Sequence, residues 1–213
     1  MDKYTTPDLT SSALITIDTQ CDTLDGQPLE IQGTSAALPN MKMLLDRFRA
    51  LSKPIIHIVR IYKKNGSNVD LCRKSAVECG QSVLLENSPG GDIAPDLMPD
   101  PAITLDSKLL LSGGIQRLSP FEVIIYKPRW GAFYKTPLEA YLKKLHVHTL
   151  IFIGCNFPNC PRTSIYEASE RDYRIILVTD ALSGLYDRGK KEMENIGVKL
   201  YKTRELLDRL RKL

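Results

Sequence analysis

Cys160 is the residue whose type and position point most clearly to chemistry. An apolar run over 150–153, closed by Gly154, is typical of a strand buried on both faces. Pro161 and a segment with helical spacing follow the cysteine. Because proline favours the first position of a helix, we predict Cys160 at the N-cap, where free N–H groups and the helix dipole would lower its pKa. A free cysteine is also often a small buried hydrophobe, so position alone leaves both interpretations open.

Two charged residues stand at the ends of other apolar segments. Asp18 follows 13–17, and Lys127 follows 123–126. In a mostly parallel sheet the carboxyl ends of the strands meet at one edge, where ligands bind. Asp18 could take the proton of a thiol, and the Lys127 ammonium could stabilise the thiolate and hold the carboxylate. An ordinary salt bridge at the sheet edge is the alternative for these two residues.

The apolar segments alternate with amphipathic ones along the chain. We predict strands at 13–17, 55–59, 123–126, 150–153, 175–178 and 198–200, and helices at 39–51, 70–79, 137–145, 188–195 and from 203. Two short antiparallel strands are predicted at 103–105 and 109–111. This order predicts one domain over 1–213, a three-layer α/β/α sandwich with a mostly parallel, Rossmann-like sheet of about six strands.

Composition limits the classes of function. The 213 residues are 43% hydrophobic and 25% charged, with a net charge of +4. No basic stripe is interleaved with aromatic residues, and no apolar run is long enough for a membrane span, so neither a nucleic acid nor a membrane is an expected partner. The polar N-terminus is unlike a signal peptide, and five cysteines without a disulfide pattern predict reduced thiols in the cytoplasm.

Four segments, in order, carry a family resemblance. They are LITIDTQ at 14–20, ALPNMKMLLDRFRALSKPIIHIVR at 37–60, YKPRWGAFYKTPLEAYLKKLHVHTLIFIGC at 126–155 and GCNFPNCPRTSIYEASERDYRIILVTDALSG at 154–184. Together they cover more than half of the chain. The chain resembles the isochorismatase-like cysteine hydrolases, a family that includes nicotinamidases, N-carbamoyl amide hydrolases and isochorismatases.

The resemblance implies a catalytic triad. By position, Asp18 matches the catalytic carboxylate, Lys127 the catalytic lysine and Cys160 the nucleophile. The implied reaction is hydrolysis of a small molecule's amide or carbamoyl C–N bond through a thioester on Cys160. The backbone N–H groups of Asn156 and Cys160 would form the oxyanion hole, and a cis peptide bond is implied at Cys155–Asn156.

Further residues are expected around the substrate. Gln20 belongs to the family's strand-Asp-x-Gln opening, and Arg60 directly follows the predicted strand 55–59. Trp130 and Phe133 could wall a pocket for a planar substrate, or could fill core or a subunit contact. Phe157 stands where many relatives have threonine and would reshape the pocket wall.

No metal or other cofactor is expected. Nicotinamidases carry an Asp-x-His metal site near the first strand, and none of His57, His146 and His148 is placed for it. The spacing of His146 and His148 could bind a metal, but we interpret it as structural because a helix meets a strand there.

Two other functions remain open. One is vinyl-ether hydrolysis of the isochorismatase type, and the other is a catalytically silent binding or scaffold protein. The family resemblance also implies a homo-oligomer, a dimer or tetramer. The segment 101–119 looks like an insertion relative to shorter relatives, which suggests a lid or a subunit contact.

Overall fold

A seven-stranded sheet forms the centre of the protein in a computed structural model that describes residues 2–213. The strands are β1 (Ser12–Ile17), β2 (Ile55–Val59), β3 (Ile115–Arg117), β4 (Glu122–Tyr126), β5 (Thr149–Gly154), β6 (Arg174–Leu182) and β7 (Lys199–Tyr201). Their order is β3-β4-β2-β1-β5-β6-β7, and β3 pairs antiparallel with β4 whereas the other neighbours pair in parallel.

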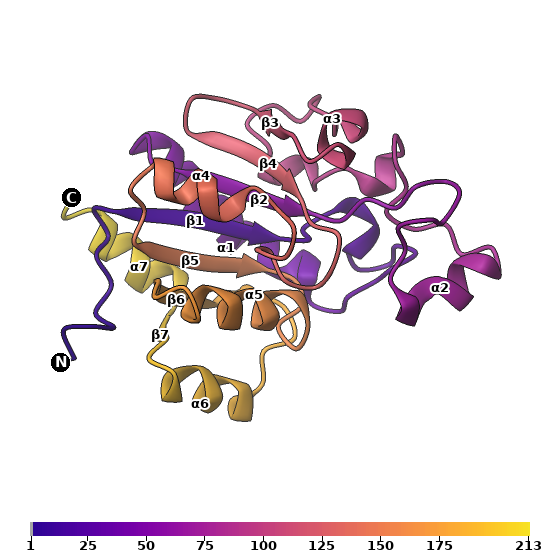
Figure 1. Cartoon of the computed structure of the whole chain (residues 1–213). Coiled ribbons are helices and arrows are strands. Elements are labelled where there is room, and N and C mark those ends of the chain that lie inside the picture. Colours follow the sequence, from indigo (N-terminus) through magenta and orange to yellow (C-terminus); the bar gives the residue numbers. More distant parts are fainter. Residues whose placement is uncertain (1) are drawn as a thin grey trace.

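Helices cover both faces of the sheet. They are α1 (Thr34–Ala50), α2 (Leu71–Glu78), α3 (Ser107–Leu111), α4 (Leu138–Lys144), α5 (Cys160–Ser169), α6 (Asp187–Asn195) and α7 (Thr203–Leu210), with 3₁₀ turns at Cys21–Thr23, Pro89–Gly91 and Pro95–Leu97. In Figure 1, α4 and α5 lie in front of the sheet, α6 lies below α5, α1 and α7 lie behind the sheet, and α2 projects beyond the tips of the parallel strands. The predicted three-layer α/β/α architecture is confirmed.

Alternating side chains of the strands fill the two layers of core. In β1, Leu14 packs in the cluster that contains Met41 of α1, and its neighbour Ile15 packs in the cluster that contains Ile165 of α5. Successive side chains of a strand point to opposite faces, so an uninterrupted apolar strand serves both layers. Every residue of β1 and β5 is buried. The strands that lead to Asp18 and Cys160 are therefore held on both faces.

The segment 101–119 differs from its prediction. The two short strands predicted at 103–105 and 109–111 are wrong, because 107–111 forms α3 and the antiparallel edge strand is β3. The Asp106 side chain accepts a hydrogen bond from the Leu109 N–H at 2.9 Å, which caps the helix. Leu110 then packs, fully buried, against the α1 side of the sheet. A role for this segment as a lid or subunit contact stays a prediction.

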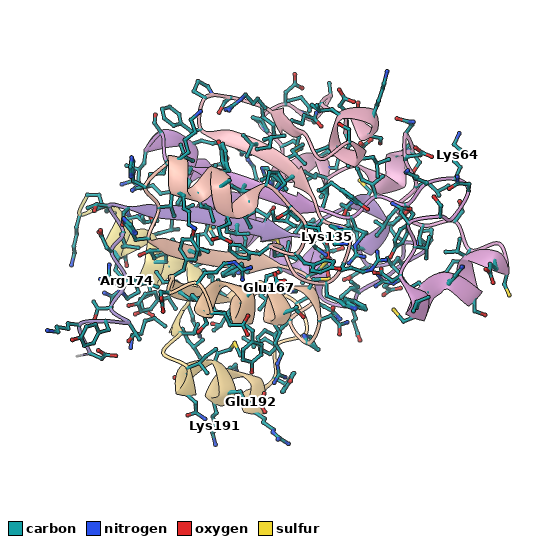
Figure 2. The ribbon with its side chains drawn as sticks, viewed as in Figure 1. Lys64, Lys135, Glu167, Arg174, Lys191 and Glu192 are labelled. Atoms are coloured by element: carbon teal, nitrogen blue, oxygen red, sulfur yellow. The ribbon has the colours of Figure 1, made fainter. Side chains whose placement is uncertain are left out.

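Polar contacts tie the front helices together. Arg162 of α5 and Glu192 of α6 form a 2.6 Å ion pair, and Figure 2 shows Glu192 at the lower edge of the molecule.

Within residues 2–213, no helix combines the length and apolar character that a membrane span requires.

Candidate active site

Asp18 is positioned by the buried strand that precedes it. Its N–H donates to the Ile58 carbonyl at 2.9 Å, which continues the pairing of β1 with β2. The backbone then turns sharply, with a φ of 50° at Asp18. The Asp18 carbonyl accepts hydrogen bonds from the Thr23 hydroxyl at 3.0 Å and the Cys155 thiol at 2.9 Å. These contacts hold a residue that has left the strand conformation.

Lys127 binds one oxygen of the Asp18 carboxylate. Its Nζ atom donates to Asp18 Oδ2 at 2.8 Å and to the Arg129 carbonyl at 3.3 Å, and the lysine is fully buried. The other oxygen, Asp18 Oδ1, is buried and has no hydrogen-bond partner among residues 2–213. The carboxylate is thus fixed through one oxygen and free to accept a proton at the other.

Cys160 lines the same cavity as Asp18. The prediction that it is the N-cap is off by one position, because Asn159 is the N-cap and Cys160 is the first residue of α5. The predicted lowering of its pKa is wrong. Burial, together with the negative charge of Asp18, raises the pKa of the Cys160 thiol to about 11, and the positive charges of Lys127 and Arg60 offset this only in part. The sulfur is therefore a protonated thiol at neutral pH, next to a carboxylate.

Backbone donors are available beside the thiol. The Cys155–Asn156 peptide bond is cis, as the family resemblance implies. Among the described residues, no acceptor is found for the N–H of Asn156 or of Cys160. Gly154 precedes this turn with a φ of 123°, and a Cβ there would lie 2.3 Å from the Ile17 carbonyl oxygen. Close contact between β1 and β5 at this point therefore requires glycine.

The cavity at Cys160 is small. Its volume is about 20 Å³, which is room for roughly one water molecule. The residues that line it are Asp18, Thr23, Leu29, Ile31, Arg60, Arg73, Leu84, Trp130, Cys155, Asn156 and Cys160. Of the five residues predicted to contact substrate, Arg60 and Trp130 line this cavity, and their contact with substrate stays a prediction.

The other three residues, Gln20, Phe133 and Phe157, are buried and are not among the residues that line this cavity. The Gln20 amide group donates to the carbonyls of Arg60 and Gly91 and accepts from the Arg60 N–H at 2.8 Å, so it braces Arg60. Phe157 is fully buried and packs edge-on against the Tyr186 ring, 5.6 Å between centroids.

Phe133 is also in the core, where its ring packs against Tyr173 at 5.9 Å. Its N–H donates to Glu167 of α5 at 2.8 Å, and Figure 2 shows Glu167 on the front face. The Ala132 N–H donates to the Ser164 hydroxyl at 3.0 Å. These bonds fasten the loop after Lys127 to the helix that carries Cys160.

Sequence reasoning missed the residues around Arg60. The Asp70 carboxylate accepts from Arg60 and from the Tyr62 hydroxyl, the latter at 2.7 Å, and Arg73 of α2 reaches the Tyr62 hydroxyl at 2.9 Å. None of these residues ends a predicted central strand. The three-residue spacing of Asp70 and Arg73 on a short helix was the one available signal.

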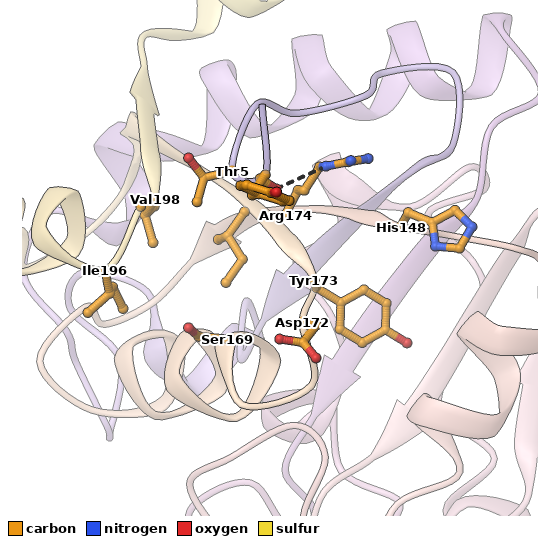
Figure 3. Close-up of a pocket in the computed structure, with 11 residues that line it drawn as sticks. Thr5, His148, Ser169, Asp172, Tyr173, Arg174, Ile196 and Val198 are labelled. Carbon is orange, nitrogen blue, oxygen red and sulfur yellow. Dashed lines mark hydrogen bonds between the residues drawn. The ribbon is translucent and has the colours of Figure 1, made fainter. Parts of the chain in front are cut away.

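A larger cavity, of about 440 Å³, lies at the other end of the sheet, and its lining includes His148, Tyr173 and Arg174 but none of Asp18, Lys127 and Cys160. Figure 3 shows it near the start of β6, where the Arg174 side chain donates to the Tyr4 carbonyl at 3.2 Å.

A second histidine, His57, contacts the Thr16 hydroxyl at 2.9 Å and the Glu122 carboxylate at 2.8 Å. Within 2–213, no three His, Cys, Asp or Glu side chains are grouped to hold a metal ion.

Comparisons with known proteins agree with this geometry. The family model "Isochorismatase domain" matches residues 12–204. A probable inactive nicotinamidase of Arabidopsis thaliana is 25% identical over 198 residues, 89% of this chain and 91% of that protein. The N-carbamoylsarcosine amidase of an Arthrobacter species is 24% identical over 162 residues, 75% of this chain and 54% of that enzyme.

Among solved structures, an isochorismatase family protein from Desulfovibrio vulgaris superposes with a TM-score of 0.79 at 27% identity, over 94% of this chain and 98% of that one. The fold, the positions of Asp18 and Lys127 after β1 and β4 and of Cys160 at the start of α5, and the match over nearly the whole chain lead to one assignment: this protein belongs to the isochorismatase family of hydrolases.

Proposed function

We propose that this protein is a cysteine hydrolase that cleaves the C–N bond of a small amide or carbamoyl compound through a thioester on Cys160. The observation that carries the proposal is the buried, unpartnered oxygen Oδ1 of Asp18 beside the thiol, in a carboxylate whose other oxygen is bound by Lys127. A raised pKa of the thiol makes such a base necessary, because few thiolates form unaided at neutral pH.

Acylation begins with the transfer of the Cys160 proton to Asp18 Oδ1. The sulfur then forms a bond to the substrate carbonyl carbon, and the N–H groups of Asn156 and Cys160 donate to the oxyanion. Asp18 returns the proton to the nitrogen as the C–N bond breaks, and ammonia or an amine leaves. Lys127 keeps the carboxylate oriented throughout.

Hydrolysis of the thioester reverses these roles. Asp18 takes a proton from water, and the hydroxide oxygen bonds to the thioester carbon. The C–S bond breaks, and the sulfur takes the proton back from Asp18. The products are an acid and the resting thiol, so no electron acceptor or other co-reactant is consumed.

Turnover of a panel of small amides and carbamoyl compounds, followed by ammonia release, tests the proposal. We expect C160A to lose at least about 10³-fold in activity. C72A, which removes an exposed cysteine, is the matched control and should keep it. Intact-mass measurement of the wild-type protein with substrate should show the acyl group on Cys160. Ammonia release that survives in C160A would contradict a thioester on Cys160. Vinyl-ether hydrolysis, the alternative activity, releases no ammonia and would appear only as turnover of a vinyl-ether substrate that persists in C160A.

A catalytically silent binding protein is the second candidate. The relation to a protein called a probable inactive nicotinamidase favours it, and so does the small volume of the cavity. This candidate predicts no turnover by either the wild type or C160A, and no acyl adduct.

A further inference from the structure

The cavity at the start of β6 has the size of a small-molecule site. Its volume is about 440 Å³, and such sites usually measure roughly 300–1,000 Å³. It lies where β5 and β6 begin, whereas Asp18 and Lys127 follow the ends of β1 and β4. A ligand bound here would therefore lie at the opposite edge of the sheet from Cys160 and would not be attacked by it.

The N-terminal segment forms one wall of this cavity. The Asp2 carboxylate accepts hydrogen bonds from the Tyr4 N–H at 2.9 Å and from the Thr5 hydroxyl at 3.1 Å. Gly197, which has a φ of 84°, lies so close to this segment that an added Cβ would be 2.6 Å from Thr5 Cγ2. The Tyr4 carbonyl in turn accepts from Arg174 Nε at 3.2 Å. The wall is thus in place before any ligand binds.

Two opposite charges line the cavity without an ionic partner. Arg174 and Asp172 both belong to its lining, and among the residues that the structure describes neither forms an ion pair. α5 ends at Ser169 in the same lining, and the negative end of the helix dipole adds to the attraction of Asp172 for a positive group. The cavity therefore offers one place for an anion and one for a cation.

An apolar surface completes the lining. It consists of Ile175, Ile196 and Val198. Ile196 is 36% exposed, so a large apolar side chain is in contact with water there. Figure 3 shows Ile196 and Val198 on one side of the cavity and His148 on the other, with Arg174 above Asp172 between them. An apolar ligand group packed against Ile196 would remove this surface from water, which is favourable in proportion to the area covered.

We propose that this cavity binds an α-amino acid with an apolar side chain. Its carboxylate accepts hydrogen bonds from the Arg174 guanidinium, its ammonium group pairs with Asp172, and its side chain packs against Ile196 and Val198. An amino acid carries one negative and one positive charge a few bonds apart, which matches the lining. A simple anion would be repelled by Asp172, and a simple cation by Arg174. Binding at this site does not depend on turnover at Cys160.

Titration calorimetry with leucine and two analogues tests the charge pattern. Leucinamide keeps the ammonium group but lacks the carboxylate, and 4-methylpentanoate keeps the carboxylate but lacks the ammonium group. We expect leucine to bind at least about 10-fold more tightly than either analogue, because each analogue leaves one charged side chain without its partner. Leucine that binds no more tightly than one of the analogues would overturn the amino-acid site.

Two variants assign the charges to their residues. R174M should bind leucine and leucinamide equally, while it still prefers leucine to 4-methylpentanoate. D172N should show the reverse pattern, and asparagine tolerates the φ of 60° at this position. R188M and D208N, which remove exposed charges from α6 and α7, are the matched controls and should keep both preferences. Unchanged preferences in R174M and D172N would overturn the proposed contacts.

Modification of histidines in the wild-type protein locates the ligand without any substitution, so it does not depend on the folding of a variant. His148 lines the cavity, whereas His146 is exposed and lies outside the lining. With diethyl pyrocarbonate as the reagent and mass spectrometry as the readout, saturating leucine should slow the modification of His148 several-fold and leave that of His146 unchanged. Equal modification of His148 with and without leucine would place the amino acid elsewhere and overturn the proposal.

Discussion

Lys127 Nζ and Asp18 Oδ2 lie 2.8 Å apart at the ends of β4 and β1, two strands that are separated in the sheet by β2. The lysine is fully buried, and the Asp18 side chain is 10% exposed. Water therefore screens this pair weakly, and each charge depends on the other for compensation. The other oxygen, Oδ1, has no hydrogen-bond partner among the described residues. Lys127 therefore holds the carboxylate through Oδ2, and Oδ1 can take a proton.

Replacing Lys127 by methionine should destabilise the fold. K127M leaves the Asp18 carboxylate buried without its partner, and we expect a loss of about 3–5 kcal/mol in the free energy of unfolding. The double variant D18N/K127M removes both charges and should be less destabilised than K127M. Urea denaturation of the wild type and the variants measures this. Equal free energies of unfolding for K127M and the wild type would show that Lys127 does not stabilise the buried charge of Asp18.

Alkylation of Cys160 should be slow at neutral pH and should accelerate in alkaline solution. The pKa of the thiol is raised to about 11 by burial, with the negative charge of Asp18 contributing next. D18N removes that charge, so it should lower the pKa of Cys160 and speed alkylation near neutral pH while abolishing turnover.

Iodoacetamide labelling across pH, located by mass spectrometry, gives both profiles. Cys72 and Cys79 are exposed and serve as internal standards in the same sample. A Cys160 that reacts as fast as these two near neutral pH would contradict the raised pKa.

Alanine at Gly154 should destabilise the protein more than alanine at Gly26. Both glycines have positive φ, 123° and 79°, so both substitutions introduce backbone strain of about 1–3 kcal/mol. At Gly26 an added Cβ meets nothing within 4 Å, whereas at Gly154 it meets the Ile17 carbonyl oxygen at 2.3 Å. The overlap should cost a further 1–3 kcal/mol or so. If G154A and G26A have the same denaturation midpoint, the expected overlap between a Cβ at position 154 and the Ile17 carbonyl oxygen is wrong.

Glu122 should make stability depend on acid pH. Burial raises the pKa of its carboxyl, but hydrogen bonds from Arg49 and His57 outweigh burial and lower it from 4.5 to about 2. A pKa lower in the folded state than in the unfolded chain contributes stability that is present above about 4.5 and is lost as the pH falls towards 2. The difference corresponds to roughly 3 kcal/mol.

Unfolding free energies of E122Q and the wild type, compared between about pH 5 and pH 2, test this. E122Q should lack most of the wild-type decline in that window. E78Q, which changes an exposed glutamate of α2, should decline as the wild type does. A decline in E122Q equal to that of the wild type would assign the acid sensitivity to other groups.

Much of the fold was predictable because its central strands are apolar without interruption. β1, β2, β4 and β5 were located within one or two residues, since each is a short, continuous apolar run bounded by polar or turn-forming residues. The segment 103–111 was not. Short apolar runs fit a strand or a helix equally well, and the Asp106 cap together with burial of Leu110 decided for α3.

The sequence by itself determined the central strands, the family and the candidate residues Asp18, Lys127 and Cys160, because apolar runs and the residue types that follow them are local information. Tertiary structure alone decided the protonation of Cys160, since burial and the charge of Asp18 come from segments 142 positions apart in the chain. It also decided which residues reach the cavity. Gln20 and Phe157 are fully buried and do not line the cavity, whereas Arg60 and Trp130 do.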